Sequence, residues 1–158
     1  MKTAELYSDA NRQWLILGRD PDRPKEIMDT NQFLLLHSGR GLLAEPGGIE
    51  LFAPMLRSVL EHIAVEDIRE VFVSHQDPDL TSSLGLWDDV LPSGTPLHAP
   101  WMWEGFLRHF GLDHMDYRGI PDDGARIGTG GLELHAVPAH FCHSPGNFQL
   151  YDPEAKLL

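Results

Sequence analysis

The fold is decided by the stretch Val71-Phe72-Val73-Ser74-His75-Gln76-Asp77-Pro78-Asp79. Three apolar residues that favour strands run into one imidazole and two carboxylates, each two positions apart. In an extended backbone alternate residues point to the same side, so His75, Asp77 and Asp79 can converge on one or two cations, while Pro78 disfavours a regular helix or central strand. The pattern indicates a metal site where a strand ends. A plain polar turn is the alternative, because Asp-Pro-Asp is also good turn chemistry.

Length and composition indicate one globular domain over residues 1–158. The chain has 158 residues, of which 42% are hydrophobic, enough for one core and too few for two large domains. Its formal net charge of −12 disfavours binding to nucleic acid or to an anionic membrane. Cys142 is the only cysteine, and the sequence has neither an N-terminal signal region nor an apolar run of about 18 residues. We expect a cytoplasmic protein.

The first half of the chain predicts short strands followed by a helix. Apolar runs separated by turn residues predict a strand meander over residues 11–45. Apolar residues at helical spacing from Phe52 to Ile63 then predict an amphipathic helix that packs on the sheet. The next strand is predicted over Val71 to Ser74.

The second half continues this alternation. A helix is predicted over Thr81 to Val90, beginning just beyond the carboxylates. A short strand from Pro96 to Ala99 precedes a short aromatic helix that ends at Gly111, whose aromatic residues are expected in the core or as a lid over the site. Two further strands are predicted over Leu132 to Val137 and Phe148 to Tyr151.

A second polar cluster, Pro138 to Asn147, again follows a predicted strand. His143 is followed by Ser-Pro-Gly, which places its imidazole on a tight loop and suits a ligand that needs a fixed angle. His140 is expected to be an ordinary surface histidine, and Cys142 a buried inert thiol. Neither is assigned to the metal site.

Strand meanders that alternate with amphipathic helices, without a regular βαβ repeat, predict an α/β (α+β) protein. The expected architecture is an αββα sandwich, in which two mixed sheets pack face to face with helices outside.

Taken together, the two clusters and their order resemble the metallo-β-lactamase superfamily, and more narrowly the diiron domain of flavodiiron proteins and their oxygen-binding relatives. The resemblance extends over nearly the whole chain and includes Asp29-Thr30-Asn31-Gln32 and Glu45-Pro46-Gly47-Gly48. Hydrolases of the superfamily typically carry His-x-His-x-Asp-His, whereas the diiron branch replaces the second histidine by an acid, as Asp77 does. The resemblance implies that His75, Asp77 and His143 hold a first metal ion and that Asp79 holds a second.

Two departures from the family pattern stand out. Leu80 occupies the position where the motif often ends in histidine, and the sequence ends before the bridging aspartate and final histidine of the family. We therefore expect a fragment of a longer domain, with an incomplete second sheet. Its exposed edge should be covered by another copy or another chain, and a homo-oligomer is expected.

Imidazole and carboxylate ligands without a thiolate suit iron, manganese or zinc. The extra carboxylate favours iron, with two ions if the remaining ligands are supplied, because its negative charge stabilises the higher oxidation state. Zinc and manganese are the alternatives. A flavin domain does not fit within this length, and the sequence shows no glycine-rich phosphate loop.

The sequence is compatible with three functional hypotheses. The first is a non-haem diiron protein that binds or reduces dioxygen or nitric oxide with electrons from an external donor. The second is a zinc hydrolase of esters or thioesters, and the third is a non-catalytic oxygen sensor. No residue is assigned a catalytic role.

Overall fold

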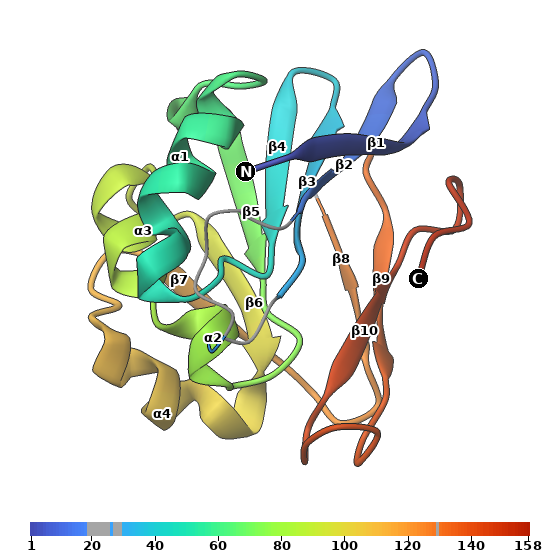
Figure 1. Ribbon diagram of the computed structural model, residues 1–158. Coiled ribbons are helices and arrows are strands. Elements are labelled where there is room, and N and C mark those ends of the chain that lie inside the picture. The colour runs from blue at the N-terminus through green and yellow to red at the C-terminus, as the bar shows by residue number, and fades with distance from the viewer. Residues whose placement is uncertain (19–25, 27–29, 129) are drawn as a thin grey trace.

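Two β-sheets stack face to face, and helices cover one of them (Figure 1). The computed structural model describes residues 1–18, 26, 30–128 and 130–158. Asp29 of the expected Asp29-Thr30-Asn31-Gln32 motif lies outside the described residues. The mixed α/β class and the stacked sheets predicted from the sequence are confirmed.

The large sheet has seven strands in the same order as in the chain. Strands β1 to β4 pair antiparallel, whereas β4 to β7 pair parallel, so the sheet is mixed. Helical crossovers connect the parallel strands and place the loops at their carboxyl ends along one edge. The strands are β1 (Thr3–Ser8), β2 (Arg12–Leu17), β3 (Gln32–His37), β4 (Arg40–Ala44), β5 (Ile68–Phe72), β6 (Pro96–Pro100) and β7 (Asp116–Ile120).

The small sheet is antiparallel throughout, in the order β10-β9-β8. Its strands are β8 (Ala125–Ile127), β9 (Leu134–Pro138) and β10 (Phe148–Tyr151). Leu134 and Ala136 of β9 alternate towards the large sheet, where they meet Phe72 in an apolar layer between the sheets. This layer fixes the distance between the loops that end β5 and β9.

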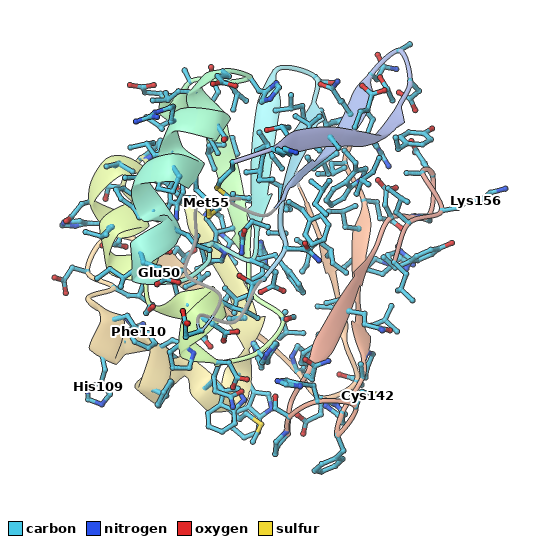
Figure 2. The ribbon with its side chains drawn as sticks, viewed as in Figure 1. Glu50, Met55, His109, Phe110, Cys142 and Lys156 are labelled. Carbon is cyan, nitrogen blue, oxygen red and sulfur yellow. The ribbon has the colours of Figure 1, made fainter. Side chains whose placement is uncertain are left out.

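The helices pack on the other face of the large sheet (Figure 1). Met55 of α1 is fully buried and points at that face (Figure 2), and Trp87 of α3 packs edge-on against Phe52. Within the described residues no helix covers the outer face of the small sheet (Figure 1). The helical elements are η1 (Ile49–Leu51), α1 (Phe52–Leu60), η2 (Val65–Asp67), α2 (Pro78–Thr81), α3 (Leu84–Val90), η3 (Trp101–Trp103), α4 (Glu104–Leu107) and η4 (Arg108–Phe110).

The structure corrects several predicted boundaries. Strand β5 begins at Ile68 and ends at Phe72, which leaves Ser74 in the loop. The helix predicted over Thr81 to Val90 is two helices, and the first begins already at Pro78, because proline fits the first turn of a helix. Trp101 and Phe106 are exposed, so they are not part of the core, which was one of the two places expected for them. No helix in the described part of the chain is long and apolar enough to cross a membrane.

Candidate metal centre

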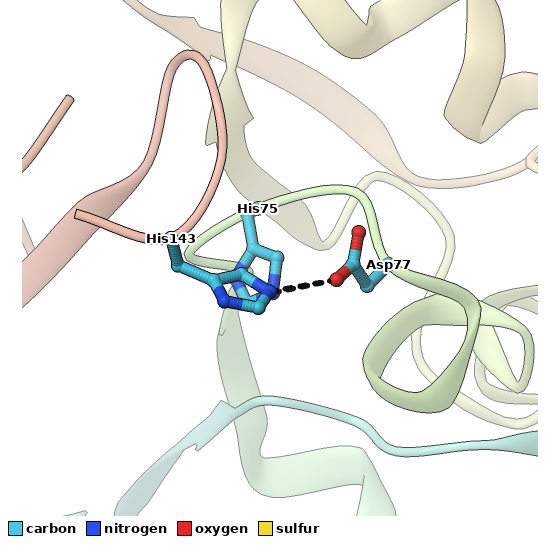
Figure 3. Close-up of side chains that lie close together, drawn as sticks. All are labelled: His75, Asp77 and His143. Carbon is cyan, nitrogen blue, oxygen red and sulfur yellow. Dashed lines mark hydrogen bonds and ion pairs between the residues drawn. The ribbon is translucent and has the colours of Figure 1, made fainter. Parts of the chain in front are cut away.

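Two loops from different sheets bring three candidate ligands together. His75 and Asp77 lie in the loop after β5, and His143 lies in the loop between β9 and β10 (Figure 3). One donor atom from each of the three side chains lies within 4.8 Å of the others. Over the described residues, no other group of three or more His, Cys, Asp or Glu side chains is arranged to hold a metal ion.

The carboxylate of Asp77 faces both histidines (Figure 3). Its Oδ2 is 2.8 Å from Nε2 of His143 and 3.5 Å from Nε2 of His75. The two imidazole rings meet edge to face, with 4.7 Å between their centroids. The predicted convergence of the three side chains is therefore present in the fold.

His75 is held by its neighbour in the chain. The hydroxyl of Ser74 lies 2.8 Å from Nδ1 of His75, so Nε2 is the nitrogen that faces Asp77 and His143. Burial lowers the pKa of His75, as does the neighbouring His143, while Asp77 and Asp79 act in the opposite direction. A lowered pKa favours the neutral imidazole, which is the form that binds metals.

The backbone around Asp77 is fixed by the helix that follows. The hydroxyl of Thr81 donates to the carbonyl oxygens of Gln76, at 3.1 Å, and Asp77, at 2.9 Å. Asp77 precedes α2 in an extended conformation, but its side chain makes no capping hydrogen bond to the helix. Its carboxylate is therefore left to face the histidines.

The loop that carries His143 is closed by its own backbone. The amide of Ala139 donates to the carbonyl of Asn147 over 2.9 Å, and the indole of Trp103 donates to the carbonyl of Pro145 over 3.0 Å. His140 lies outside the cluster, with Nε2 2.8 Å from the carbonyl oxygen of Asp122. Cys142 is also outside the cluster; it is exposed on this loop (Figure 2), so the expectation of a buried thiol is wrong.

Asp79 shares a cleft with the cluster without belonging to it. The cleft has a volume of about 660 Å³, and Leu80 contributes an apolar side chain where the family motif often has histidine. Asp79 thus lines the same cleft as the cluster, and its role as the ligand of a second ion stays a prediction. The cleft is lined by Thr30, Asn31, Phe33, Glu45, Ser74, His75, Asp77, Pro78, Asp79, Leu80 and His143.

Glu45 also lines the cleft, and the sequence had suggested only a turn at this position. Its φ of 57° bends the chain directly after β4, and its Oε1 accepts the amide hydrogen of Ser74 over 3.0 Å. Oε2 is buried with no hydrogen-bond partner among the described residues. Burial raises the pKa of Glu45 to about 7, with a smaller contribution from Asp79. Glu45 directly follows β4, the neighbour of β5 in the sheet, and this position is the signal that could have identified it as a site residue.

The chemistry of the three side chains fits a metal ion. Ligand atoms that sit about 2.0–2.2 Å from one ion lie roughly 3–3.5 Å from each other, close to the spacings around Asp77. Two imidazoles and one carboxylate without a thiolate suit iron, manganese or zinc. The residues therefore form a candidate site for one ion, open on the side of the cleft.

The chain is similar to a protein family and to solved structures, some of which are described as containing diiron. A family model described as ODP family beta lactamase matches residues 28–158. A structure described as the peroxy diiron species of chemotaxis sensor ODP shares 32% identity and a TM-score of 0.81, and covers 96% of this chain and 60% of that chain. The apo state of chemotaxis sensor ODP from T. denticola shares 33% identity and a TM-score of 0.79, covering 97% and 59%.

A more distant likeness extends to flavodiiron proteins. A variant of the flavo di-iron protein from Thermotoga maritima shares the fold with 18% identity and a TM-score of 0.74, covering 95% of this chain and 39% of that chain. The chain thus spans about 60% of the length of the ODP chains that it matches. No curated protein matches it.

Proposed function

Because this chain belongs to the ODP family of beta-lactamase proteins, we propose that it holds iron through His75, Asp77 and His143 and binds dioxygen at that site. The resemblance to the diiron branch of the metallo-β-lactamase superfamily, inferred from the two clusters, is confirmed by the family match. The identity of the metal ion and the reaction at the site are what we propose here.

The observation that carries the proposal is that the carboxylate of Asp77 faces two imidazoles from separate loops. Superfamily hydrolases typically place a histidine where Asp77 stands. The carboxylate adds negative charge next to the metal, which stabilises ferric iron and makes a bound water a poorer acid. Redox chemistry is therefore favoured over hydrolysis.

Each residue has a defined part in this proposal. His75 presents Nε2 because Ser74 occupies Nδ1, and Asp77 supplies the anionic ligand. Asp79 is proposed to hold a second iron in the same cleft. Bound iron supplies the affinity for dioxygen or nitric oxide that side chains lack. Phe33 and Leu80 contribute apolar side chains to the lining of this cleft.

The similarity to the ODP structures favours binding of the gas without turnover. The two ODP structures that share about a third of their residues with this chain are chemotaxis sensors, and one is a peroxy diiron species. Reduction of dioxygen or nitric oxide would need an external electron donor. Hydrolysis of esters by a zinc form is the competing hypothesis, and zinc or manganese are the alternative metals.

We propose that residues 1–158 belong to one cytoplasmic domain that does not bind nucleic acid. Strand β10 lies at the edge of the small sheet, and an uncovered edge favours association. A homo-oligomer is proposed on that ground.

Elemental analysis of protein purified without chelator tests the proposal. The expected result is bound iron, a visible or near-ultraviolet absorption band that changes on exposure to dioxygen, and no measurable ester hydrolysis. If the protein is colourless, binds zinc and hydrolyses esters, the proposal is wrong and the hydrolase hypothesis takes its place. Oxygen uptake with and without a chemical reductant then separates turnover from binding.

A further inference from the structure

Ser74 makes contacts in three directions at the centre of the site. Its hydroxyl lies 2.8 Å from Nδ1 of His75. Its amide donates to Oε1 of Glu45 over 3.0 Å, and its carbonyl accepts the amide hydrogen of Phe148 over 3.0 Å. Ser74 thus joins the turn after β4, the first residue of β10 and the side chain of His75.

Glu45 anchors this junction from the large sheet. Its backbone amide donates to the carbonyl of Phe72 over 2.9 Å, which ties the turn to the end of β5. The left-handed conformation of Glu45 turns the chain so that its side chain returns to Ser74. Side chain and backbone therefore hold residues 72 and 74, immediately before His75.

The contacts of His75 determine where its ring proton is best placed. Nδ1 has a partner at hydrogen-bond distance, the Ser74 hydroxyl, whereas Nε2 is 3.5 Å from Oδ2 of Asp77, too far for a good hydrogen bond. That oxygen is already 2.8 Å from Nε2 of His143, which must donate to a carboxylate. A proton on Nδ1 therefore makes the better bond and leaves the Nε2 lone pair facing the cluster.

We propose that Ser74 and Glu45 are positioning residues: Ser74 accepts the Nδ1 hydrogen of His75 and so keeps Nε2 free for a metal ion, while Glu45 holds Ser74 in place. Partners of this kind fix both the tautomer and the ring angle of metal-binding histidines. The inference rests on the proposed metal site, but not on iron or on dioxygen.

The ring tautomer can be measured in the metal-free protein. Nitrogen chemical shifts of the histidine rings at about pH 8, where neutral imidazole dominates, should show His75 protonated on Nδ1. Ser74→Ala should shift His75 towards protonation on Nε2, the form that dominates in free histidine, and Ser74→Thr should restore Nδ1. A wild-type His75 protonated on Nε2, or a tautomer that Ser74→Ala leaves unchanged, overturns the inference without any variant having to bind metal.

Affinity for zinc, used as a spectroscopically silent probe ion, supplies the second measurement. Ser74→Ala should bind zinc about 10–100-fold more weakly than wild type, and Ser74→Thr should recover most of this loss. Glu45→Gln, which keeps an acceptor oxygen for the Ser74 amide, should bind within about threefold of wild type, whereas Glu45→Ala should lose about tenfold. Equal zinc affinity of the Gln and Ala variants overturns the role of Glu45.

The same experiments separate this inference from the proposed function. Zinc affinity and the His75 tautomer do not depend on iron or dioxygen. If the protein does not bind dioxygen but shows the expected His75 tautomer and zinc affinities, the positioning role of Ser74 and Glu45 still holds. Circular dichroism of each variant checks that it is folded. If Ser74→Ala does not fold, the wild-type tautomer and the comparison of the two Glu45 variants decide the inference.

Discussion

Oδ2 of Asp77 lies 2.8 Å from Nε2 of His143, although the two residues are 66 positions apart in the chain and belong to loops of different sheets. Without an ion this contact is a hydrogen bond between a carboxylate and an imidazole. In the proposed metal-bound form both groups would instead direct a lone pair to the ion, so the ion would take the place of this hydrogen bond between the two loops.

Replacing His143 tests this contact directly. His143→Ala should lower metal content markedly, because the cluster loses one of its three donors. His140→Ala is the matched control from the same loop: its Nε2 faces the carbonyl of Asp122, and metal content should stay near that of wild type. Inductively coupled plasma analysis after identical loading gives the answer. Equal losses in both variants would contradict the assignment.

The choice of metal should depend on Asp77. Asp77→His removes the anionic donor and should raise the ratio of bound zinc to bound iron, with weaker stabilisation of the ferric state. The measurement is the ratio of the two metals after loading from an equimolar mixture, followed by esterase assays. A wild type that already prefers zinc and hydrolyses esters faster than the variant would refute the redox assignment.

Glu45 should make the stability of the metal-free protein depend on pH. Burial raises its pKa from 4.5 to about 7, so the folded state binds a proton that the unfolded state has released. The stabilisation is complete below pH 4.5 and is lost as the pH rises to about 7, and the difference corresponds to about 3 kcal/mol. Glu45→Gln should lack this loss. Urea unfolding of both proteins between these pH values measures the loss of stability. If the free energy of unfolding changes with pH in the same way in both proteins, the prediction is wrong.

Two helical glycines should respond in opposite ways to alanine. A Cβ at Gly85 of α3 would lie 2.1 Å from the carbonyl oxygen of Phe110, which is backbone and cannot move aside cheaply. Gly85→Ala should therefore destabilise the protein by about 2 kcal/mol or more. Gly105 of α4 has open space around it, and Gly105→Ala should stabilise by about 0.5–1 kcal/mol. Thermal unfolding compares the two, and a stable Gly85→Ala would show that α3 packs differently.

A buried ion pair connects the two sheets away from the metal site. Arg12 of β2 pairs with Asp152 just after β10, both side chains are almost fully buried, and the indole of Trp14 donates to Asp152 over 2.7 Å. Asp152→Ala leaves the Arg12 charge buried without this partner and should cost about 3–5 kcal/mol. The exposed pair of Asp116 and Arg118 is the control, and Asp116→Ala should cost less than about 1 kcal/mol. Similar losses in the two variants would contradict this account.

Segments with one buried face could be predicted from the sequence. Strand β10 matches its predicted bounds, because Phe148 faces the core and the loop before it is rich in turn residues. His75 and Asp77 were singled out because they alternate directly after an apolar run, and His143 because a Ser-Pro-Gly sequence follows it. Strand β1 was missed, since most of its side chains are exposed and Glu5 and Leu6 interrupt any apolar alternation. Strand β7 is also largely exposed and β8 is very short, and the pairing of both depends on neighbours that no local pattern reveals.

Glu45 shows a second limit of sequence reasoning. Its segment was recognised as a turn from the residues that follow it, but a turn pattern does not reveal where the side chain goes. The parallel pairing of β4 with β5 is what brings Glu45 next to Ser74. Such a contact depends on sheet order, which is a property of the whole fold.

Because each sheet joins strands in the order in which they are synthesised, every strand pairs with a neighbour made just before or after it. Local pairing of this kind keeps the entropic cost of loop closure low. The loop with His75 and Asp77 can therefore be in place on the large sheet before the hairpin with His143 has been made. The proposed metal cluster is completed only when the small sheet docks on the large one, so we expect an ion to be captured after the large sheet has formed rather than to act as a nucleus for its folding.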